Sequence, residues 1–368
     1  LFRSGRAMQL QSVSTYLAQG LGFSAIADGL AVVETGGYTR LLYTARNENQ
    51  VRDLVLEPAT TPTPNDPPPN SDLAIQTTAE LPRVFVYSAY SAPLRVTSLP
   101  VAGTLPAAAV LTTATGSISG VTAMEILEGG ASDIAIVASR YVAGLQMFRL
   151  SNAGDMQLIG AITDGPKAYL GAVSDLASVK INGEYILLTL SAHENGISSY
   201  RIGADGSAEL IDSLGATEGL PINGPAAMQV AEVGGQRFVV IASTLTDSLT
   251  VVRVNDMGVL FPADHVVDDL GTRFEGTAAL DMFQSHGRSF VLTGGTDAGL
   301  SLFELLPEGK LSHLQSFALE TGAGIGAITS IETQVNGDKV MVFLVDAAGE
   351  KIYHHQLSLA QMGDSFRA

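Results

Sequence analysis

A repeat of about 51 residues runs through this 368-residue chain and constrains its fold more than any other feature. A short apolar strand is predicted to begin at the same point of five successive units, at Pro93, Gly144, Gly196, Ser248 and Gly299. The steps between these residues are 51, 52, 52 and 51 residues. A constant period of this length predicts one supersecondary unit per repeat, packed against its neighbours in the chain.

Each repeat contains four predicted strands. In one unit, the strand that begins at Ser248 follows the apolar strand Arg237–Ser243, and a further strand with alternating small and apolar residues, Ala226–Ala231, precedes both. Where a fourth strand follows, a turn such as Asp205-Gly206 provides the positive φ angle of a tight hairpin. Four antiparallel strands in each unit are typical of a β-propeller blade.

The number of units predicts seven blades. Seven units of 51 residues would occupy 357 of the 368 residues, and the first unit fits between Phe23 and Glu57. We therefore predict an all-β chain that folds as a seven-bladed β-propeller of four-stranded antiparallel blades.

The two ends of the sequence predict how the ring closes. The last unit ends after a third strand, Lys351–Leu357, whereas residues 8–16 form an additional strand pattern near the N-terminus. This pattern resembles Leu311–Ala318, the fourth strand of the preceding blade. We expect residues 8–16 to complete the last blade. A ring closed in this way leaves no blade interface uncovered, so residues 1–368 are predicted to form a single domain.

A proline-rich segment at residues 59–71 interrupts the repeat between blades 1 and 2. Five of the fifteen prolines lie within the eleven residues 60–70. Because proline cannot donate to a central ladder, we expect an extended, solvated connector there, with a ligand-peptide segment as the alternative. The interval from Ala45 to Ala89 is only 44 residues, so one strand of this region is predicted to be missing or degenerate.

The composition excludes several classes of function. The chain has 20 Lys and Arg against 37 Asp and Glu, a net charge of −17, which disfavours nucleic acid and anionic membranes as partners. It contains no cysteine, which excludes disulfides, thiolate catalysis and cysteine-ligated metals. No apolar run approaches the ~20 residues of a transmembrane helix, so none is predicted.

Several repeats resemble known propeller families. The strand Gly196–Ile202, the turn Gly203–Ser207 and the strand Leu210–Leu214 resemble units of lactonase-type seven-bladed propellers, the 6-phosphogluconolactonase-like group. That resemblance implies hydrolysis of a lactone at the mouth of the central channel. Gly144–Leu150 and Gly299–Leu305 are also similar to propeller segments of large secreted RTX-type bacterial proteins. The absence of tryptophan departs from the Trp-Asp and kelch families.

The predicted channel mouth is the default binding site. In a propeller, the loops between strands two and three and the blade-to-blade connections share one face around the channel. The charged residues and histidine predicted on that face are Arg46, Glu48, Arg140, Lys167, His193, Glu194, Glu218, Asp247, Arg273, Glu275, Asp297, Glu320 and Asp346.

Two sets of these residues are candidate sites. Lactone hydrolysis requires a base to activate water and a cation or donor for the oxyanion, which His193 and Glu194 with Arg140 and Arg273 could supply. The alternative is that these four are ordinary solvated loop residues. Asp247, Asp297 and Asp346 could hold Ca²⁺ together with backbone carbonyls, although aspartate also favours turns for its own sake.

We therefore expect a non-catalytic binding or assembly module at the bacterial surface or outside the cell, as part of a larger RTX-like protein. Its expected partner is a protein or a glycan in an extracellular assembly. No cofactor is required, and Ca²⁺ is the one candidate ion. The alternative expectation is an enzyme, a lactonase-type hydrolase that acts at the channel mouth.

Overall fold

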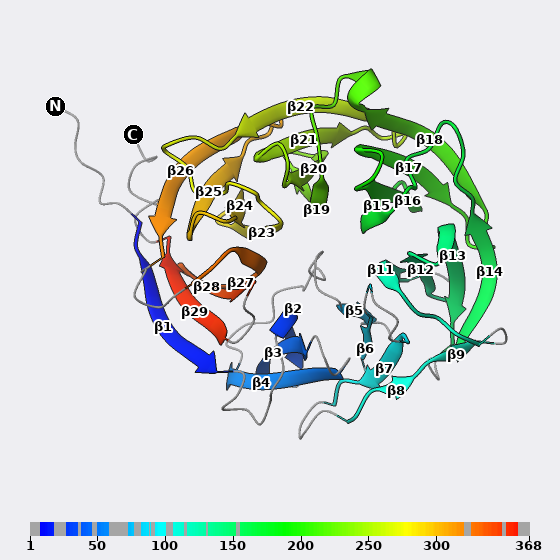
Figure 1. Cartoon of the computed structure of the whole chain (residues 1–368), viewed down its shortest axis with the longest axis horizontal. Helices are drawn as coiled ribbons and strands as arrows, with labels where there is room; N and C mark the ends of the chain where they lie inside the picture. Colours follow the sequence, from blue (N-terminus) through cyan, green and yellow to red (C-terminus); the bar gives the residue numbers. More distant parts are fainter. Residues whose placement is uncertain are drawn as a thin grey trace.

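The computed structural model arranges seven β-sheets around a central axis (Figure 1). It describes residues 8–17, 27–35, 38–45, 50–58, 73–76, 82–87, 89, 93–100, 106–113, 116–129, 132–151, 155–319, 325–347 and 351–359. Arg46, Glu48, Glu320 and the proline-rich segment 59–71 lie outside these residues. The predictions of an all-β chain and of a seven-bladed propeller are confirmed. The described helical structure is a single 3-10 turn, η2 (Ala216–Glu218).

Blades 1 and 2 depart from the regular pattern, whereas blade 3 is a four-stranded sheet like those that follow it. The strands of blade 1 are β2 (Ala27–Thr35), β3 (Tyr38–Ala45) and β4 (Gln50–Pro58). Those of blade 2 are β5 (Leu73–Gln76), β6 (Arg83–Val86), β7 (Arg95–Ser98) and β8 (Ala109–Val110). A two-stranded sheet of β9 (Thr112–Thr113) and β10 (Gly116–Ser117) precedes blade 3. Blade 3 contains β11 (Val121–Leu127), β12 (Ile134–Ser139), β13 (Val142–Leu150) and β14 (Met156–Ile162).

The last four blades each contain four strands. Blade 4 contains β15 (Val173–Ile181), β16 (Glu184–Ser191), β17 (Gly196–Ile202) and β18 (Ala208–Gly215). Blade 5 contains β19 (Pro225–Val233), β20 (Gln236–Ser243), β21 (Ser248–Val254) and β22 (Leu260–Val267). Blade 6 contains β23 (Ala279–Ser285), β24 (Arg288–Gly294), β25 (Gly299–Leu305) and β26 (Leu311–Ala318). Blade 7 contains β27 (Ile328–Asn336), β28 (Lys339–Asp346), β29 (Lys351–Ser358) and β1 (Leu10–Leu17).

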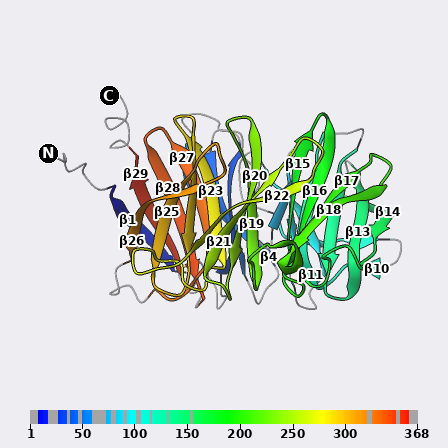
Figure 2. The ribbon, with the colours of Figure 1, turned by 90° about the horizontal axis from the view of Figure 1, so that it is seen from above.

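The sheets stand side by side because the second strand of a blade is apolar on both faces. In β20, Val239 and Ile241 pack into the core shared with blade 4. The alternate residues of the same strand, such as Phe238 and Val240, pack into the core shared with blade 6. Successive side chains of a strand point to opposite faces, so a continuous apolar run fits a sheet that is covered on both sides. Figure 2 shows the sheets from the edge of the ring, with strands crossing between its two faces.

The turns between the third and fourth strands confirm the predicted hairpins. Gly206 and Gly309 adopt φ angles of 88° and 83°, a region that glycine tolerates best. At Gly309 a side chain would also collide with the ring of Phe238 in the neighbouring blade. These glycines therefore set both the turn and the close approach of adjacent blades.

The ring is closed as predicted, by a strand from the N-terminal region. β1 pairs antiparallel with β29, from Leu10 opposite Leu357 to Leu17 opposite Lys351. Figure 1 shows β1, in blue, beside β29, in red. The strand spans Leu10–Leu17, displaced slightly from the predicted residues 8–16. Met8 still takes part, because its carbonyl accepts a hydrogen bond from Gln315 Nε2 in blade 6 at 2.8 Å.

The irregular region also lies where the spacing predicted it. In the described part of blade 1, β2, β3 and β4 form a three-stranded sheet. The strands of blade 2 contain only two to four residues each. Within the described ranges, the structure contains no helix long and apolar enough to cross a membrane.

Candidate functional site

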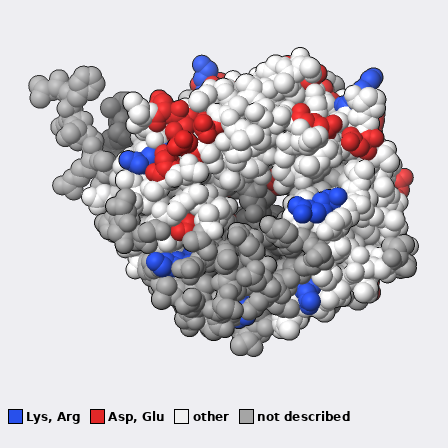
Figure 3. All heavy atoms as spheres, viewed as in Figure 1, with Lys and Arg blue, Asp and Glu red and all other residues white. Residues whose placement is uncertain are grey.

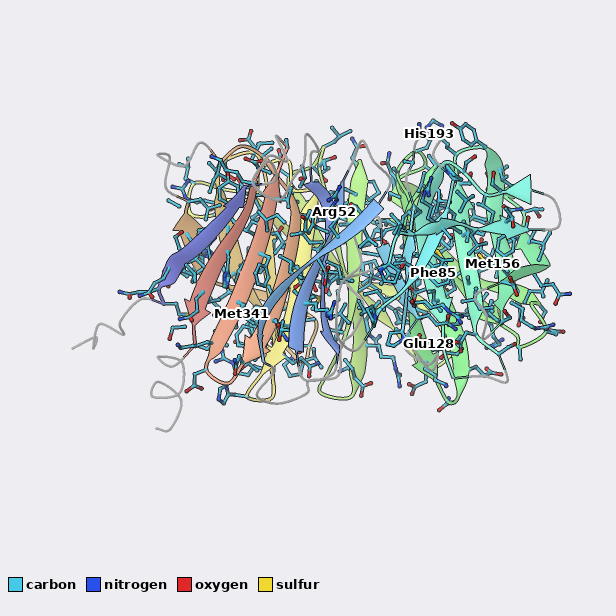
Figure 4. The ribbon with its side chains drawn as sticks, turned by 90° about the horizontal axis from the view of Figure 1, so that it is seen from below. Arg52, Phe85, Glu128, Met156, His193 and Met341 are labelled. Atoms are coloured by element: carbon cyan, nitrogen blue, oxygen red, sulfur yellow. The ribbon has the colours of Figure 1, made fainter. Side chains whose placement is uncertain are left out.

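The predicted site residues and the central cavity occupy different parts of the ring. His193 lies in the loop between β16 and β17, the second and third strands of blade 4. Glu128 lies in the loop between β11 and β12, the first and second strands of blade 3. Figure 4 shows these two labelled residues at opposite faces of the ring. We call the face that carries His193 the connection face and the opposite one the hairpin face.

The side chain and amide of Glu194 hold its own loop in place through hydrogen bonds. Its Oε2 accepts hydrogen bonds from the Gly171 amide at 2.7 Å and from Ser191 Oγ at 3.4 Å. The Glu194 amide in turn donates to Ser191 Oγ at 3.1 Å. The neighbouring His193 is exposed, and its amide donates to the Gly171 carbonyl at 3.4 Å. The His193–Glu194 pair therefore anchors the loop to the connection that enters blade 4.

The two candidate arginines belong to other blades. Arg273 lies in the connection between β22 and β23, where its Nη1 donates to the Asp297 carbonyl at 3.4 Å and its amide donates to Ser301 Oγ at 2.8 Å. Arg140 is exposed in the turn between β12 and β13, where its amide donates to the Gly120 carbonyl at 2.9 Å. These contacts place Arg140, Glu194 and Arg273 in three separate loops. Their catalytic roles stay a prediction.

The candidate calcium ligand Asp247 joins two blades. Its Oδ1 accepts the Gly276 amide at 2.7 Å. In the loop one repeat earlier, Asn195 Oδ1 accepts the Gly224 amide at 2.8 Å in the same way. Both residues adopt positive φ angles, of 47° and 53°. Because an uncharged Asn fills the same position, blade-to-blade bonding accounts for the Asp247 carboxylate.

The other two candidate ligands have separate environments. Asp346 Oδ2 accepts the Gly326 amide at 3.0 Å. Burial raises the pKa of Asp297, and the nearby charge of Asp268 raises it further. Within the described ranges, no group of three histidine or carboxylate residues is placed so that it could hold a metal ion. Calcium binding by these aspartates stays a prediction.

The central channel holds a cavity of about 760 Å³. Its wall receives residues from the innermost strand of all seven blades, namely Val32, Ala74, Glu125, Ala177, Gln229, Asp281 and Glu332. Figure 3 shows the hollow at the centre of the ring. The residues that line this cavity do not include His193, Glu194, Arg140 or Arg273. The cavity is therefore a second candidate site, made by strands rather than by loops.

Buried carboxyl groups on the inner strands connect each blade to the next. Asp281 Oδ2 accepts the amide and the hydroxyl of Thr333 at 2.7 and 2.6 Å, and Oδ1 accepts Gln229 Nε2 at 2.6 Å. Asp175 accepts the Met228 amide at 2.8 Å. Each acceptor lies one blade before at least one of its donors. These groups therefore hold the innermost strands at a fixed separation around the axis.

The buried carboxyl groups of Asp175, Asp281 and Glu332 have raised pKa values. Burial raises the pKa of Asp175 and of Glu332 well above the ordinary value, because an apolar surrounding disfavours the charged form. The nearby Asp281 raises the pKa of Glu332 further. Burial also raises the pKa of Asp281, although hydrogen bonds from Thr333 and Gln229 oppose the change.

Sequence reasoning missed this inner ring because it searched the loops. A signal was present, since Glu125, Gln229, Asp281 and Glu332 recur at intervals of one or two repeats within apolar strands. A carboxyl group on a strand that faces the core is uncommon unless it has a partner or a function.

Comparison with known proteins supports the architecture. A protein from Lactobacillus plantarum is similar with a TM-score of 0.53 and 12% identity, over 91% of this chain and 95% of that one. Virginiamycin B lyase from Staphylococcus aureus is similar with a TM-score of 0.55 and 12% identity, over 96% of this chain and 99% of that one. At this identity the likeness shows the fold alone. No protein family and no curated protein matches the sequence.

Proposed function

We propose that this propeller is a non-catalytic binding or assembly module that engages a protein or glycan partner through its connection face. One observation carries the proposal: this face turns large apolar side chains to solvent, while its carboxylates Glu194 and Asp247 are bound to backbone amides. Leu245 is 69% exposed, Val267 is 51% exposed and Leu270 is fully exposed. Exposed apolar side chains gathered on one surface are typical of a partner site.

These apolar residues belong to neighbouring segments of the connection face. Leu245 lies in the loop between β20 and β21, and Val267 is the last residue of β22. The Asp268 amide donates to the Asp247 carbonyl at 2.7 Å, which joins that loop to the segment that carries Leu270. The surface is therefore fixed by hydrogen bonds before a partner arrives, which lowers the entropy cost of binding.

The proposal includes the surroundings of the module. We place it outside the cell or at the bacterial surface, as one part of a larger RTX-like protein, with no required cofactor and Ca²⁺ as the one candidate ion. The resemblance of Gly144–Leu150 and Gly299–Leu305 to secreted propellers supports this placement, as does an acidic chain without cysteine.

A binding assay tests the leading proposal. Labelled protein is applied to a glycan array and to intact bacterial envelopes, and the Leu245→Asp/Leu270→Asp variant is compared with Leu158→Asp. Leu158 is an exposed residue on the outer strand β14 and serves as the matched control. We expect the double variant alone to lose binding by about tenfold or more. Equal binding by both variants would contradict the proposed surface.

The alternative is a lactonase-type hydrolase, which the exposed His193 beside Glu194 on the connection face favours. A panel of aliphatic and sugar lactones, followed by acid release in a pH-stat, separates the two functions. The leading proposal expects no rate above buffer. Turnover that the His193→Ala variant abolishes would establish the hydrolase instead.

A further inference from the structure

The wall of the central cavity is polar on the adjacent blades 5, 6 and 7, and blade 3 adds one further polar residue between two apolar blades. At the level of the buried carboxyl groups, blades 3, 5, 6 and 7 contribute Glu125, Gln229, Asp281 and Glu332. The corresponding wall residues of blades 1, 2 and 4 are Val32, Ala74 and Ala177. A ligand that fits this wall therefore has one polar end and an apolar body.

Glu332 has an acceptor oxygen that the described protein leaves without a partner. The residue is only 5% exposed. Its Oε1 accepts the Val32 amide at 3.0 Å, whereas Oε2 is buried and accepts no hydrogen bond from the residues that the structure describes. Leaving such an oxygen unpaired is unfavourable, because the buried acceptor has lost its hydrogen bonds to water. A donor supplied by a ligand would remove this cost.

Asp281 is a carboxyl group of this wall whose two oxygens both accept hydrogen bonds from the protein. Its two oxygens accept hydrogen bonds from Gln229, Met282 and Thr333. Glu125 similarly accepts Ser178 Oγ at 2.6 Å. Both groups hold neighbouring blades together. Among the carboxyl groups that the structure describes in this wall, Glu332 therefore offers an open acceptor to a ligand.

The charges around the cavity favour a cationic donor. The basic residues of the lining, Lys180 and Arg237, are engaged at the hairpin face. Lys180 Nζ lies 4.9 Å from the centre of the Tyr185 ring, and Arg237 pairs with the Asp256 carboxylate at 2.9 Å. The net charge of −17 adds a field that attracts cations.

The geometry favours an organic cation over a metal ion. The described part of the chain contains no group of three histidine or carboxylate residues that could hold a metal. A volume of about 760 Å³ lies within the range of small-molecule sites, roughly 300–1,000 Å³. The wall also offers Ile126, Val230 and Phe283 to an apolar body. An ammonium group donates directional hydrogen bonds to a carboxyl oxygen while its carbon body stays in the apolar part.

We propose that the central cavity binds a small primary amine as its ammonium ion, with Glu332 Oε2 as the direct acceptor and Asp281 and Glu125 as neighbouring carboxyl groups. This small-molecule site is distinct from the partner surface on the connection face. Its failure and the failure of the proposed function are therefore observed in separate experiments.

Calorimetric titration of the full chain tests the site. The probes are benzylamine and 1,5-diaminopentane, and their neutral counterparts are benzyl alcohol and 1-pentanol. We expect both amines to bind, and each alcohol to bind weaker by about tenfold or more, because only the ammonium ion is a charge-assisted donor. Equal binding of amine and alcohol, or binding of neither amine, would overturn the proposal.

Two variants locate the amine. Glu332→Gln keeps an acceptor for the Val32 amide but replaces the open oxygen with an N–H donor, so amine affinity should fall by about tenfold or more. Glu308→Gln, an exposed residue of the turn between β25 and β26, is the matched control and should leave affinity unchanged.

Should circular dichroism show that Glu332→Gln is unfolded, Ala177→Lys provides the second test. Its own ammonium group should enter the cavity and block the probes. Unchanged affinity in a folded variant would refute the assignment.

Two further titrations identify the source of the ammonium group. A blocked Gly-Lys-Gly peptide presents the same group on a protein chain and should bind more weakly than benzylamine, because the inner strands enclose the acceptor. Tighter binding of the peptide would overturn the small-amine assignment in favour of a partner's lysine. Calcium chloride should not displace benzylamine, and displacement would overturn the preference for an organic cation.

Discussion

Blades 5 and 7 reach the same architecture by different routes. Blade 5 takes its four strands from one continuous segment, Pro225–Val267, whereas blade 7 combines β27, β28 and β29 with β1 from the other end of the sequence. The outermost strand of each blade is also linked to the preceding blade. In blade 5 the Leu260 amide donates to Asp212 Oδ2, and in blade 7 Gln315 Nε2 donates to the Met8 carbonyl.

The comparison shows that a strand becomes the outermost strand of a blade through its contact with the neighbouring blade, and that it need not follow the other strands directly in the chain. The two blades differ in the entropy cost of bringing the outermost strand into place. The Gln315–Met8 hydrogen bond joins residues 307 positions apart, whereas β21 and β22 are joined by a short turn. Closing the longer loop costs about 3–4 kcal/mol more. The start of β1 is also poorly covered, with Val13 54% exposed. We therefore expect blade 7 to open before blade 5.

Removing residues 1–17 should have the largest effect. Without β1 the edge of β29 is unpaired, and the blade loses both its ladder and the link to Gln315. We expect the melting temperature to fall by about 10 °C or more, or the protein to aggregate through the exposed edge. Calorimetry and light scattering measure these outcomes.

The control for this deletion removes only residues 1–7, before β1. It should melt close to the full chain. Equal melting of both truncated proteins would show that β1 does not carry the closure.

Replacing Asp175 by Ala should have the next largest effect, because it breaks the hydrogen bond that joins blade 4 to blade 5. The amides of Leu176 and Met228 lose their acceptor, at a cost of about 3 kcal/mol. Chemical denaturation measures this loss. Asp256→Ala, which removes an exposed partner of Arg237, is the control and should change stability by less than about 0.5 kcal/mol.

The same variant should show a defined pH dependence. Because burial raises the folded-state pKa of Asp175, ionisation opposes folding as the pH rises from the unfolded pKa of about 3.9 towards the folded value. The destabilisation by Asp175→Ala is therefore expected to be larger at pH 5 than at pH 8. The opposite order would show that Asp175 is stabilised as a carboxylate.

Acid should weaken blade 7 by a smaller amount through His355, which pairs with Ser12 of β1. Burial, together with the charge of the neighbouring His354, lowers the pKa of His355 to about 4. The unfolded state therefore takes up a proton first, and stability is lost as the pH falls from about 6.5 to 4. We expect a loss of about 2 kcal/mol across this range.

The His355→Phe variant tests this effect, because Phe303 has the equivalent strand position in blade 6. Denaturation at pH 7 and at pH 4.5 should show a flatter pH dependence for the variant. An unchanged acid response would assign the effect to other groups.

Removing divalent metal should have the smallest effect. Asp247 and Asp346 each accept an amide from a glycine of the adjoining connection, so their stability does not depend on an ion. We expect excess EDTA to shift the melting temperature by less than about 1 °C. A larger fall that calcium reverses would establish an ion on the connection face.

The sequence predicted the fold well because the repeat is a property of local patterns. Alternating apolar residues and the turn glycines Gly206 and Gly309 specify a blade without reference to the rest of the chain. The start of β1 was predicted only approximately, since its pairing with β29 depends on residues far away in the sequence.

The candidate site was harder to predict because one residue type serves several purposes. From the sequence, Asp247 was a candidate metal ligand. In the structure its side chain accepts a glycine amide of the next connection, as Asn195 does one repeat earlier. The open oxygen of Glu332 depends on which groups of blades 1 and 6 come within reach. No local pattern contains that information.

The register of β1 and β29 also determines how the ring would respond to mechanical force. Leu10 lies opposite Leu357, so Met8 and Leu359 emerge from the same end of this strand pair. A pull on these two residues would separate the strands one hydrogen bond at a time, like a zipper, instead of shearing all of them at once. Tension along a longer polypeptide would then release this single seam at low force while the other six blades stay folded.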